Sequence, residues 1–427
     1  MKIAFFTLGC KVNQYETSVM ERTALAAGHT PVDLDGEPDA VVVNSCTVTA
    51  ESDKKTRQML HRFRRAFPRA VLVVTGCLPQ ARPEGIAPKE ADVVLGNASN
   101  GRLLENVERF LRTGERIVDL TPHERGESFD LSLLDRFPER TRAYIKIQDG
   151  CERYCTYCII PRARGFNRSK PPEEIAREAA LLAANGHKEI VLVGINLSAY
   201  GQEIGADLAD AAEAVCTVSG VQRVRLGSLE PDLFTDEMLV RLKALPAFCP
   251  QFHLALQSGS DAVLRRMNRH YDTAFFADLV ARVRAAFPGA AITTDVMVGF
   301  PGETAEDHER SLAFVRQIGF ARCHVFAYSR RPGTPAAGMP GQLSAAVKQA
   351  RSREMIAAAA ESERAFLRGL IGSEQSVLFE TRENGQNRGY TPTYVTVCAE
   401  GPDRRGEIVR VRITGADGEE LIGEMCP

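Results

Sequence analysis

Nine residues near the middle of the chain decide how the rest of the sequence is interpreted: Gly150-Cys151-Glu152-Arg153-Tyr154-Cys155-Thr156-Tyr157-Cys158. The three cysteines have the spacing C-x3-C-x2-C and follow a mostly apolar stretch, residues 144–147. Thiolates this close together in a loop can converge on one metal centre. Three thiolates leave one iron of a 4Fe-4S cluster open, whereas a structural zinc site needs four closed ligands. The alternative is a zinc site whose fourth ligand lies elsewhere in the chain.

Composition is that of an ordinary globular protein. The chain has 427 residues, 44% of them hydrophobic and 25% charged, which is enough for two or three domains. The net charge of −2 means that a nucleic-acid partner would need local basic patches. No apolar run approaches the ~18 residues that span a bilayer, so we expect no membrane partner. Eleven cysteines without a signal-peptide core predict a reducing cytoplasmic location and metal ligation.

Residues 1–112 alternate apolar runs with helical patterns, which predicts an α/β domain with a doubly wound parallel sheet. The predicted strands are 3–8, 40–44, 70–75 and 92–95, and the predicted helices are 14–27, 51–67 and 101–111. Cys10, Cys46 and Cys77 each lie one to three residues past one of these strands. Because open α/β sheets bind ligands at that edge, the three thiols are expected to be neighbours. The alternative is three unrelated buried cysteines.

Residues 113–141 are charged, contain Pro122 and Pro138, and are predicted to form a linker. Residues 142–335 then show six more strand–helix units, with predicted strands at 143–148, 189–193, 222–226, 252–256, 291–298 and 323–328. Predicted helices fall between them, for example at 172–185, 272–287 and 305–318. Six units are two short of a closed (β/α)8 barrel, so we expect an open partial (β/α)6 barrel with its site on the carboxyl-terminal face. Polar and glycine-rich stretches follow four of these strands, at 194–196, 228–230, 257–259 and 299–303.

The carboxyl-terminal part of the chain has a different sequence pattern. Residues 336–371 are predicted to form a linker and a helix, and residues 372–427 a small antiparallel β-barrel with strands at 376–380, 394–397, 408–413 and 420–423. From Gly372 onward there are six Arg and no Lys against ten Asp and Glu, a net charge of −4. This balance weakens the electrostatic case for RNA binding by the barrel.

With these residues in hand, the central motif resembles the signature of the radical S-adenosylmethionine enzymes, and Tyr157 fits it as well. Over nearly its whole length the chain resembles the methylthiotransferases, which place a methylthio group on a tRNA base or a ribosomal protein. Residues 7–16 look like the opening of that family's amino-terminal domain, and residues 372–427 look like its RNA-binding TRAM domain. Residues 11–16 and 158–165 are most similar to enzymes acting on threonylcarbamoyladenosine in tRNA.

The resemblance implies two 4Fe-4S clusters. Cys151, Cys155 and Cys158 fall on the ligands of the radical cluster, whose open iron binds S-adenosylmethionine and whose electron cleaves it to a 5′-deoxyadenosyl radical. The other three cysteines fall on the ligands of an auxiliary cluster, where a second S-adenosylmethionine methylates a sulfur. The residues expected to bind S-adenosylmethionine are Tyr157, Gly194, Asn196, Glu230, Gln257, Gly299, Gly302 and Glu303. Each of those at a strand end has an alternative role as a turn or cap residue.

The implied reaction is methylthiolation of C2 of N6-threonylcarbamoyladenosine at tRNA position 37, next to the anticodon, with external electron and sulfur donors. A threonyl carboxylate needs a cation, and a guanidinium can bind it with two hydrogen bonds. The candidates are Arg162, Arg164, Arg168, Arg330 and Arg331; their alternative roles are cofactor contacts or loop packing. Alternative substrates are isopentenyladenosine in tRNA or a ribosomal-protein side chain, and a non-catalytic iron–sulfur or zinc RNA-binding protein is a further alternative.

One predicted helix, residues 51–67, is strongly basic. Its cations, with one just beyond it, are Lys54, Lys55, Arg57, Arg62, Arg64, Arg65 and Arg69. A solvated face is the default interpretation of such a run. Contact with tRNA phosphates is the alternative, because the helix follows the Cys46 loop.

Overall fold

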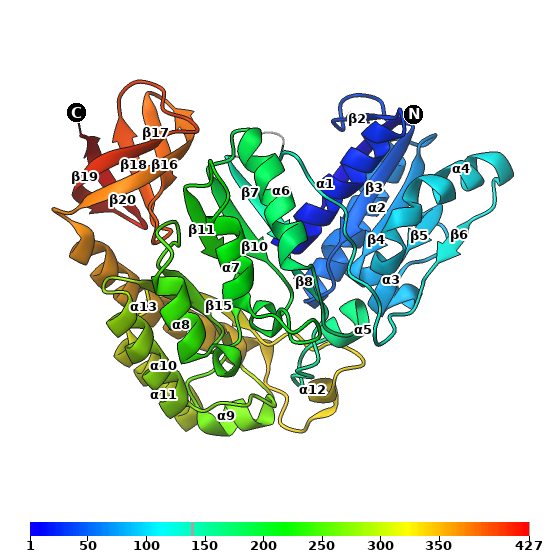
Figure 1. The fold of residues 1–427 in the computed structure, drawn as a ribbon. Coiled ribbons are helices and arrows are strands. Elements are labelled where there is room, and N and C mark those ends of the chain that lie inside the picture. Colours follow the sequence, from blue (N-terminus) through cyan, green and yellow to red (C-terminus); the bar gives the residue numbers. More distant parts are fainter. Residues whose placement is uncertain (138–140, 427) are drawn as a thin grey trace. The chain divides into compact units, whose positions relative to one another are not determined.

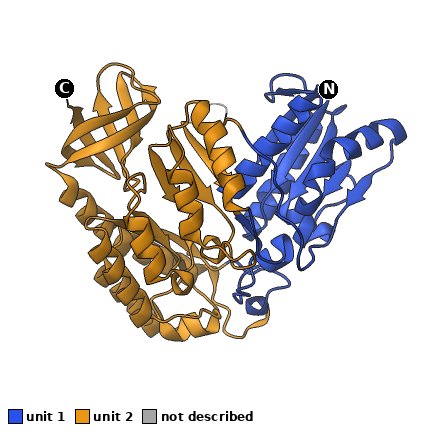
Figure 2. Ribbon diagram, in the orientation of Figure 1, with its two compact units in different colours: residues 1–134, 148–170, 329–337 blue, residues 135–147, 171–328, 338–427 orange. Residues whose placement is uncertain are grey.

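The computed structural model describes residues 1–137 and 141–426 (Figure 1). The chain forms two compact units (Figure 2). Unit 1 comprises residues 1–134, 148–170 and 329–337, and unit 2 comprises residues 135–147, 171–328 and 338–427. Residues 138–140, in the predicted linker, and Pro427, in the predicted terminal barrel, lie outside the described residues. All six cysteines of the two predicted triads belong to unit 1.

Unit 1 is built on a six-stranded, entirely parallel sheet with the order β2-β1-β3-β4-β5-β6. The strands are β1 (Lys2–Thr7), β2 (Thr30–Val32), β3 (Ala40–Ser45), β4 (Val71–Gly76), β5 (Val93–Leu95) and β6 (Ile117–Asp119). The helices are α1 (Lys11–Ala26), α2 (Ala50–Ala66), α3 (Cys77–Ala81) and α4 (Leu103–Thr113). β3 and β4 are buried at every position, as expected for central strands covered on both faces.

Two separate apolar clusters show that helices cover both faces of this sheet. Met20 of α1 and Val107 of α4 pack with Val42 on one face. Leu60 of α2 and Leu78 of α3 pack on the other. The predicted doubly wound parallel sheet is therefore confirmed. Two edge strands, β2 and β6, have only three residues each, too few to show the alternation that predicts a strand. β6 lies within the segment predicted as a linker.

Unit 2 contains six parallel strand positions in series. The order β7-β10-β11 forms one sheet and β12-β13-β14-β15 the next. These strands are β7 (Arg142–Lys146), β10 (Glu189–Val193), β11 (Arg223–Leu226), β12 (Ser228–Leu229), β13 (Gln251–Leu254), β14 (Ala291–Val298) and β15 (Arg322–Ala327). Gly227 separates β11 from β12. β11 pairs with β10 in the first sheet, and β12 pairs with β13 in the second. The predicted open partial barrel is confirmed.

Helices connect these strands as a parallel sheet requires. They are α6 (Pro172–Ala184), α7 (Leu208–Cys216), α8 (Asp236–Lys243), α9 (Asp261–Arg266), α10 (Thr273–Ala286) and α11 (Ala305–Ile318). A short helix, α12 (Pro335–Gly338), and the long α13 (Ala345–Leu370) follow β15. The predicted helix at 305–318 matches α11 to the residue. Thr304 precedes this helix in a capping box. Its side chain accepts from the backbone N–H of Asp307, and the Asp307 side chain accepts from the backbone N–H of Thr304.

The carboxyl-terminal strands form a closed barrel with the order β16-β17-β18-β20-β19. They are β16 (Glu374–Glu383), β17 (Gln386–Tyr390), β18 (Thr396–Glu400), β19 (Ile408–Asp417) and β20 (Glu420–Met425). The predicted small antiparallel barrel is confirmed, except that one of its pairs, β18 with β20, is parallel. β17 was missed because it lacks a run of β-branched residues. A Cβ on Gly389 of this strand would lie 2.1 Å from the carbonyl oxygen of Leu378.

Candidate iron–sulfur and cofactor sites

Cys10, Cys46 and Cys77 lie at the carboxyl ends of three adjacent strands. Cys10 is three residues past β1 and precedes α1, Cys46 directly follows β3, and Cys77 directly follows β4 and begins α3. The chain leaves β1 towards β2 and returns to β3 on its other side, so the strand order reverses between β1 and β3. Open α/β sheets bind ligands at such a switch point.

The loops that carry these cysteines are closely packed. Gly9 has a φ of +118°, and a Cβ there would lie 2.9 Å from the Cβ of Cys46. Gly76 has a φ of +94°, and a Cβ there would lie 2.5 Å from backbone and side-chain oxygens of the β3 end. Only glycine adopts these conformations without strain. The side-chain amide of Asn13 donates to the Leu8 carbonyl at 3.1 Å and to the Ser45 carbonyl at 2.9 Å, so it links the first two loops.

The electrostatic surroundings of these thiols suit a metal cluster. Burial raises the pKa of Cys77 to about 12, with the Arg164 guanidinium acting in the opposite direction. Burial also raises the pKa of Cys46. Because cluster ligands are thiolates, binding here requires positive charge to offset the burial. Among the described residues, no three His, Cys, Asp or Glu side chains converge on a single metal ion. Thiolates of a four-iron cluster bind different irons and therefore lie farther apart.

Arg164 joins the auxiliary-cysteine loops to the loop of the radical motif. It is the last residue of α5 (Ile160–Arg164), only six positions after Cys158, and its side chain is fully buried. Its Nε donates to the Cys77 sulfur at 3.3 Å. The two terminal nitrogens bind both carboxylate oxygens of Glu16, one of them at 3.0 Å, and contact Asp149 at 3.3 Å. One guanidinium thus serves a cysteine of one triad from the helix that follows the other.

The radical motif forms a compact loop closed by a two-stranded antiparallel ladder, β8 (Gln148–Asp149) with β9 (Arg168–Ser169). Gly150 has a φ of +77°, and a Cβ there would lie 1.7 Å from the Phe166 carbonyl oxygen. The backbone N–H of Cys151 donates to the Gly165 carbonyl at 3.0 Å, and the backbone N–H of Cys158 donates to the Cys155 carbonyl at 2.9 Å. The fold therefore gathers all three cysteines into one turn-rich loop, as a cluster site requires.

Seven of the eight residues predicted to bind S-adenosylmethionine lie in unit 2, past the carboxyl ends of its parallel strands; Tyr157 belongs to unit 1. Glu230 pairs with Arg269, and Glu303 pairs with Arg351 and accepts from the Gly299 N–H at 3.0 Å. Gln257 has a left-handed φ of +66°. Its side-chain Oε1 is buried and has no hydrogen-bond partner among the described residues. An unpaired buried acceptor at this edge fits a bound polar cofactor.

The five candidate substrate-binding arginines fall into two groups. Arg164 and Arg331 are fully buried, and Arg331 binds Asp53 and Thr47, each at 2.7 Å. Arg168 pairs with Asp149 at 3.2 Å. Arg162 and Arg330 are exposed, and neither has a carboxylate partner in the described part of the chain. Both belong to unit 1, where Arg330 donates to the Ala337 carbonyl at 2.8 Å.

Comparisons with known proteins agree with this geometry. The family model of the radical SAM superfamily matches residues 145–315, and that of the uncharacterised protein family UPF0004 matches residues 2–96. A solved structure of the radical S-adenosylmethionine methyltransferase TsrM from Kitasatospora setae has a TM-score of 0.59 at 16% identity. It covers 79% of this chain and 77% of that chain. The fold and the motif together define a radical S-adenosylmethionine enzyme.

Relatives in sequence narrow the class. The chain is 38% identical to the threonylcarbamoyladenosine tRNA methylthiotransferase MtaB of Bacillus subtilis, over 97% of this chain and 94% of that protein. It is 37% identical to the protein of the same name from Thermotoga maritima, over 97% and 95%. A tRNA-2-methylthio-N(6)-dimethylallyladenosine synthase from Pelotomaculum thermopropionicum is 32% identical, over 99% and 97%. The chain belongs to the radical S-adenosylmethionine methylthiotransferases, in the threonylcarbamoyladenosine tRNA methylthiotransferase branch. Its cofactors are of the 4Fe-4S and S-adenosylmethionine types.

Proposed function

We propose that this enzyme methylthiolates C2 of N6-threonylcarbamoyladenosine at position 37 of tRNA, next to the anticodon. It would use two 4Fe-4S clusters and two S-adenosylmethionine molecules. The observation that carries the proposal is the pair of three-cysteine sites within one compact unit, each one ligand short of closing a cluster. The relatives named for threonylcarbamoyladenosine support the choice of substrate, at 34–38% identity against 32% for those named for dimethylallyladenosine.

In this proposal, Cys151, Cys155 and Cys158 hold the radical cluster, which supplies one-electron cleavage of S-adenosylmethionine. Cys10, Cys46 and Cys77 hold the auxiliary cluster. The polar residues of unit 2 past the barrel strands are its candidates for binding S-adenosylmethionine, with the unpaired Gln257 Oε1 as one acceptor; Tyr157, in the motif loop of unit 1, is a separate candidate. Electron and sulfur donors come from outside the chain. No helix in the described part is long and apolar enough to cross a bilayer.

The test is a reconstituted reaction on tRNA that carries threonylcarbamoyladenosine, followed by nucleoside mass spectrometry. Wild-type enzyme should contain about eight irons and form the 2-methylthio nucleoside. Replacing the radical-motif cysteines by Ala should halve the iron and abolish 5′-deoxyadenosine. Replacing Cys10, Cys46 and Cys77 should leave 5′-deoxyadenosine formation intact and stop methylthio transfer. Wild-type protein with about four irons would contradict the two-cluster proposal.

One observation favours a second candidate, a ribosomal-protein side chain as the target: the carboxyl-terminal barrel carries a net charge of −4 from Gly372 onward. Methylthiolation of tRNA by the purified enzyme, and loss of the modified nucleoside from cells lacking the protein, would exclude this candidate.

A further inference from the structure

We infer that the solvent face of α2 in unit 1, rather than the terminal barrel, supplies the main electrostatic contact with the phosphates of the RNA substrate. This inference rests on the proposed function, because it takes tRNA as the partner. The α2 face is defined here by Lys54, Lys55, Arg62 and Arg65, with Lys89 beside it.

The charge of this segment is one-sided. Residues 54–69 contain seven Lys and Arg, and no Asp or Glu occurs between residues 54 and 83. The buried side of α2 consists of Asp53, Thr56, Leu60 and Phe63, so the helix packs on the sheet through one stripe. Lys55, Arg62 and Arg65 are spaced i, i+7 and i+10 and lie on the opposite, exposed side.

Most of these cations have no internal partner to neutralise them. Lys54, Lys55 and Arg62 make no ion pair or hydrogen bond with their side chains within the described residues, and the Arg65 Nε donates only to the His61 carbonyl, at 3.4 Å. Arg64 differs, because it binds Asp92 at 2.7 Å and is therefore part of the fold. The unbalanced charge thus belongs to the outer face alone.

A hollow beside the helix could take a phosphate group. It has a volume of about 400 Å³ and is lined by His61, Arg64, Arg65, Lys89 and Glu90. Glu90 is already bound to His61 at 2.9 Å and accepts from the Ala87 N–H at 2.7 Å. Arg65 and Lys89 have no carboxylate partner among the described residues, so two cations at this hollow remain available to an anion. Arginine and lysine side chains in such a setting bind RNA phosphates.

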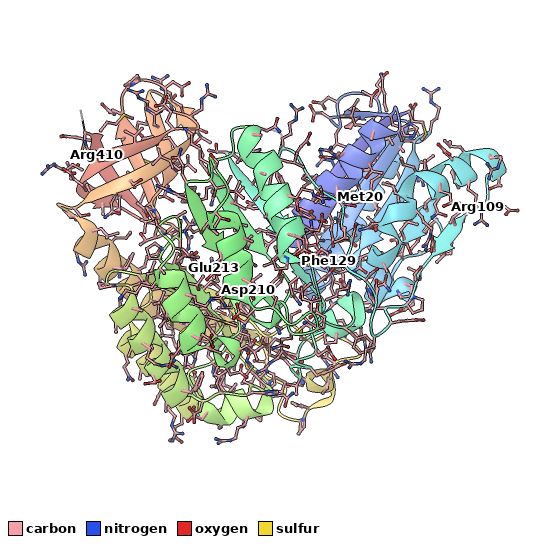
Figure 3. The ribbon with its side chains drawn as sticks, in the orientation of Figure 1. Met20, Arg109, Phe129, Asp210, Glu213 and Arg410 are labelled. Atoms are coloured by element: carbon pink, nitrogen blue, oxygen red, sulfur yellow. The ribbon has the colours of Figure 1, made fainter. Side chains whose placement is uncertain are left out.

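The terminal barrel shows the contrasting pattern. Four of its six arginines are paired with carboxylates: Arg388 with Glu420, Arg404 with Glu407, Arg405 with Asp403, and Arg412 with Glu374. Arg382 donates to a backbone carbonyl, and Arg410, labelled in Figure 3, is left without a carboxylate partner in the described residues. With a net charge of −4, this barrel offers little free positive charge to a polyanion.

The experiment measures binding of tRNA carrying threonylcarbamoyladenosine to the full-length, reconstituted enzyme across a range of KCl concentrations. The test variant is R62Q/R65Q. The matched control is R109Q/R112Q, which also removes two exposed arginines three residues apart. These lie on α4, on the opposite face of the same sheet, where Figure 3 labels Arg109. None of these four side chains makes an ion pair with another described residue, so both variants should fold.

We expect R62Q/R65Q to reduce the slope of log K against log salt by up to about 1.8, or about 0.9 per lost duplex phosphate contact. Affinity at 0.1 M salt should fall roughly ten- to sixty-fold by the same counterion-release relation. R109Q/R112Q and R410Q should bind as wild type does. Adding K89Q to the test variant should weaken binding further.

Other outcomes would overturn the inference in distinguishable ways. Unchanged affinity and slope in R62Q/R65Q, with wild-type enzyme modifying the tRNA, would return α2 to a solvated face and leave the proposed function intact. R62Q/R65Q could instead bind tRNA as wild type does and lose turnover only when an acidic redox protein, in place of dithionite, supplies the electrons. That result would assign the α2 face to an electron donor. Wild-type enzyme that neither binds nor modifies this tRNA would contradict the proposed function itself.

Discussion

Arg164 links the loops of the two predicted cysteine triads within unit 1. Its guanidinium is fully buried, binds Glu16, Asp149 and Asn13, and donates to the Cys77 sulfur. Hydrogen bonds to cluster sulfurs raise reduction potentials, and outer partners of metal ligands tune the metal they support. Arg164 is therefore a positioning residue for Cys77, and a substrate role is incompatible with these contacts.

Replacing Arg164 by Lys should lower the reduction potential of the auxiliary cluster, because a single ammonium cannot keep the bond to Cys77 while it also satisfies both carboxylates. The potential can be followed by redox titration with electron paramagnetic resonance in protein that lacks the three radical-motif cysteines, so that one cluster gives the signal. R162K, at an exposed position of the same helix, is the control. A potential equal to the control in R164K would show that Arg164 acts only on packing.

The positions of the cysteines at strand ends follow from the sequence, whereas the burial and ion pairs of Arg164 do not, and the reason is physical. Each auxiliary cysteine follows a buried strand, and strand ends can be recognised from local hydrophobic patterns. The partners of Arg164 cannot be recognised from local patterns, because Glu16 is 148 positions away and the pairing depends on how the loops meet. Residues 11–16 and 158–165 carry family-like motifs, yet no local pattern indicates that Asn13 and Glu16 contact Arg164.

At the scale of elements, a buried ion network joins two parts of unit 2. Glu189 of β10 binds Arg225 of β11 at 2.8 Å and Arg223 at 3.4 Å. These arginines also donate to backbone carbonyls of the terminal barrel, Arg223 to Tyr390 at 2.9 Å and Arg225 to Pro392 at 2.8 Å. Glu189 therefore holds the two side chains that attach the barrel to the central strands.

The Glu189 network predicts acid sensitivity. Burial alone would raise the pKa of Glu189, but Arg225, Arg142 and Arg223 together outweigh it and hold the pKa below its ordinary value of 4.5. The unfolded state therefore binds a proton first as the pH falls. The resulting stabilisation is fully present above about pH 4.5 and is lost below it, as the pH falls through the folded-state pKa.

Replacing Glu189 by Gln should cost about 3–5 kcal/mol of unfolding free energy at neutral pH, because two buried guanidinium groups lose their carboxylate. The variant should also lose this part of the acid dependence. Urea unfolding between about pH 2 and pH 7 measures both effects. The control is E213Q, which breaks a partly exposed pair with Arg241 on α8 and should cost about 0–1 kcal/mol; Figure 3 labels Glu213 and its neighbour Asp210. Equal losses in the two variants would contradict the network's role.

The accuracy of the predicted boundaries is higher for longer and more regular helices and strands. Long helices such as α11 and buried strands such as β3 and β4 were placed to within one or two residues, because periodicity and burial agree in them. β2 and β6 are too short to carry a pattern, and β17 contains a buried Asn387 instead of an apolar residue. The parallel β18–β20 pair was missed because strand direction in a closed barrel depends on closure rather than on local sequence.

At the scale of the whole molecule, the remaining question is how the enzyme selects its nucleoside. Threonylcarbamoyladenosine carries a carboxylate and a hydroxyl, whereas the isopentenyl group is apolar. A buried carboxylate without a partner is costly, so the site needs an available cation. Of the five predicted arginines, Arg164, Arg168 and Arg331 are bound to acidic side chains of the fold, which leaves Arg162 and Arg330. These two are the candidates for recognising the threonyl carboxylate.

Substitution of Arg162 or Arg330 by Ala should lower kcat/KM on threonylcarbamoyladenosine tRNA by roughly 10- to 100-fold, the value of one lost hydrogen bond to a charged group. We expect activity on isopentenyladenosine tRNA to be low in wild-type enzyme and not to fall in the same variant, because that substrate offers no carboxylate. R109A, an exposed arginine of α4, controls for a general loss of positive charge. Side-by-side kinetics on the two purified tRNAs decide the matter. Equal wild-type turnover on both substrates would refute selection by charge, and undiminished selectivity in both variants would remove these arginines from the substrate site.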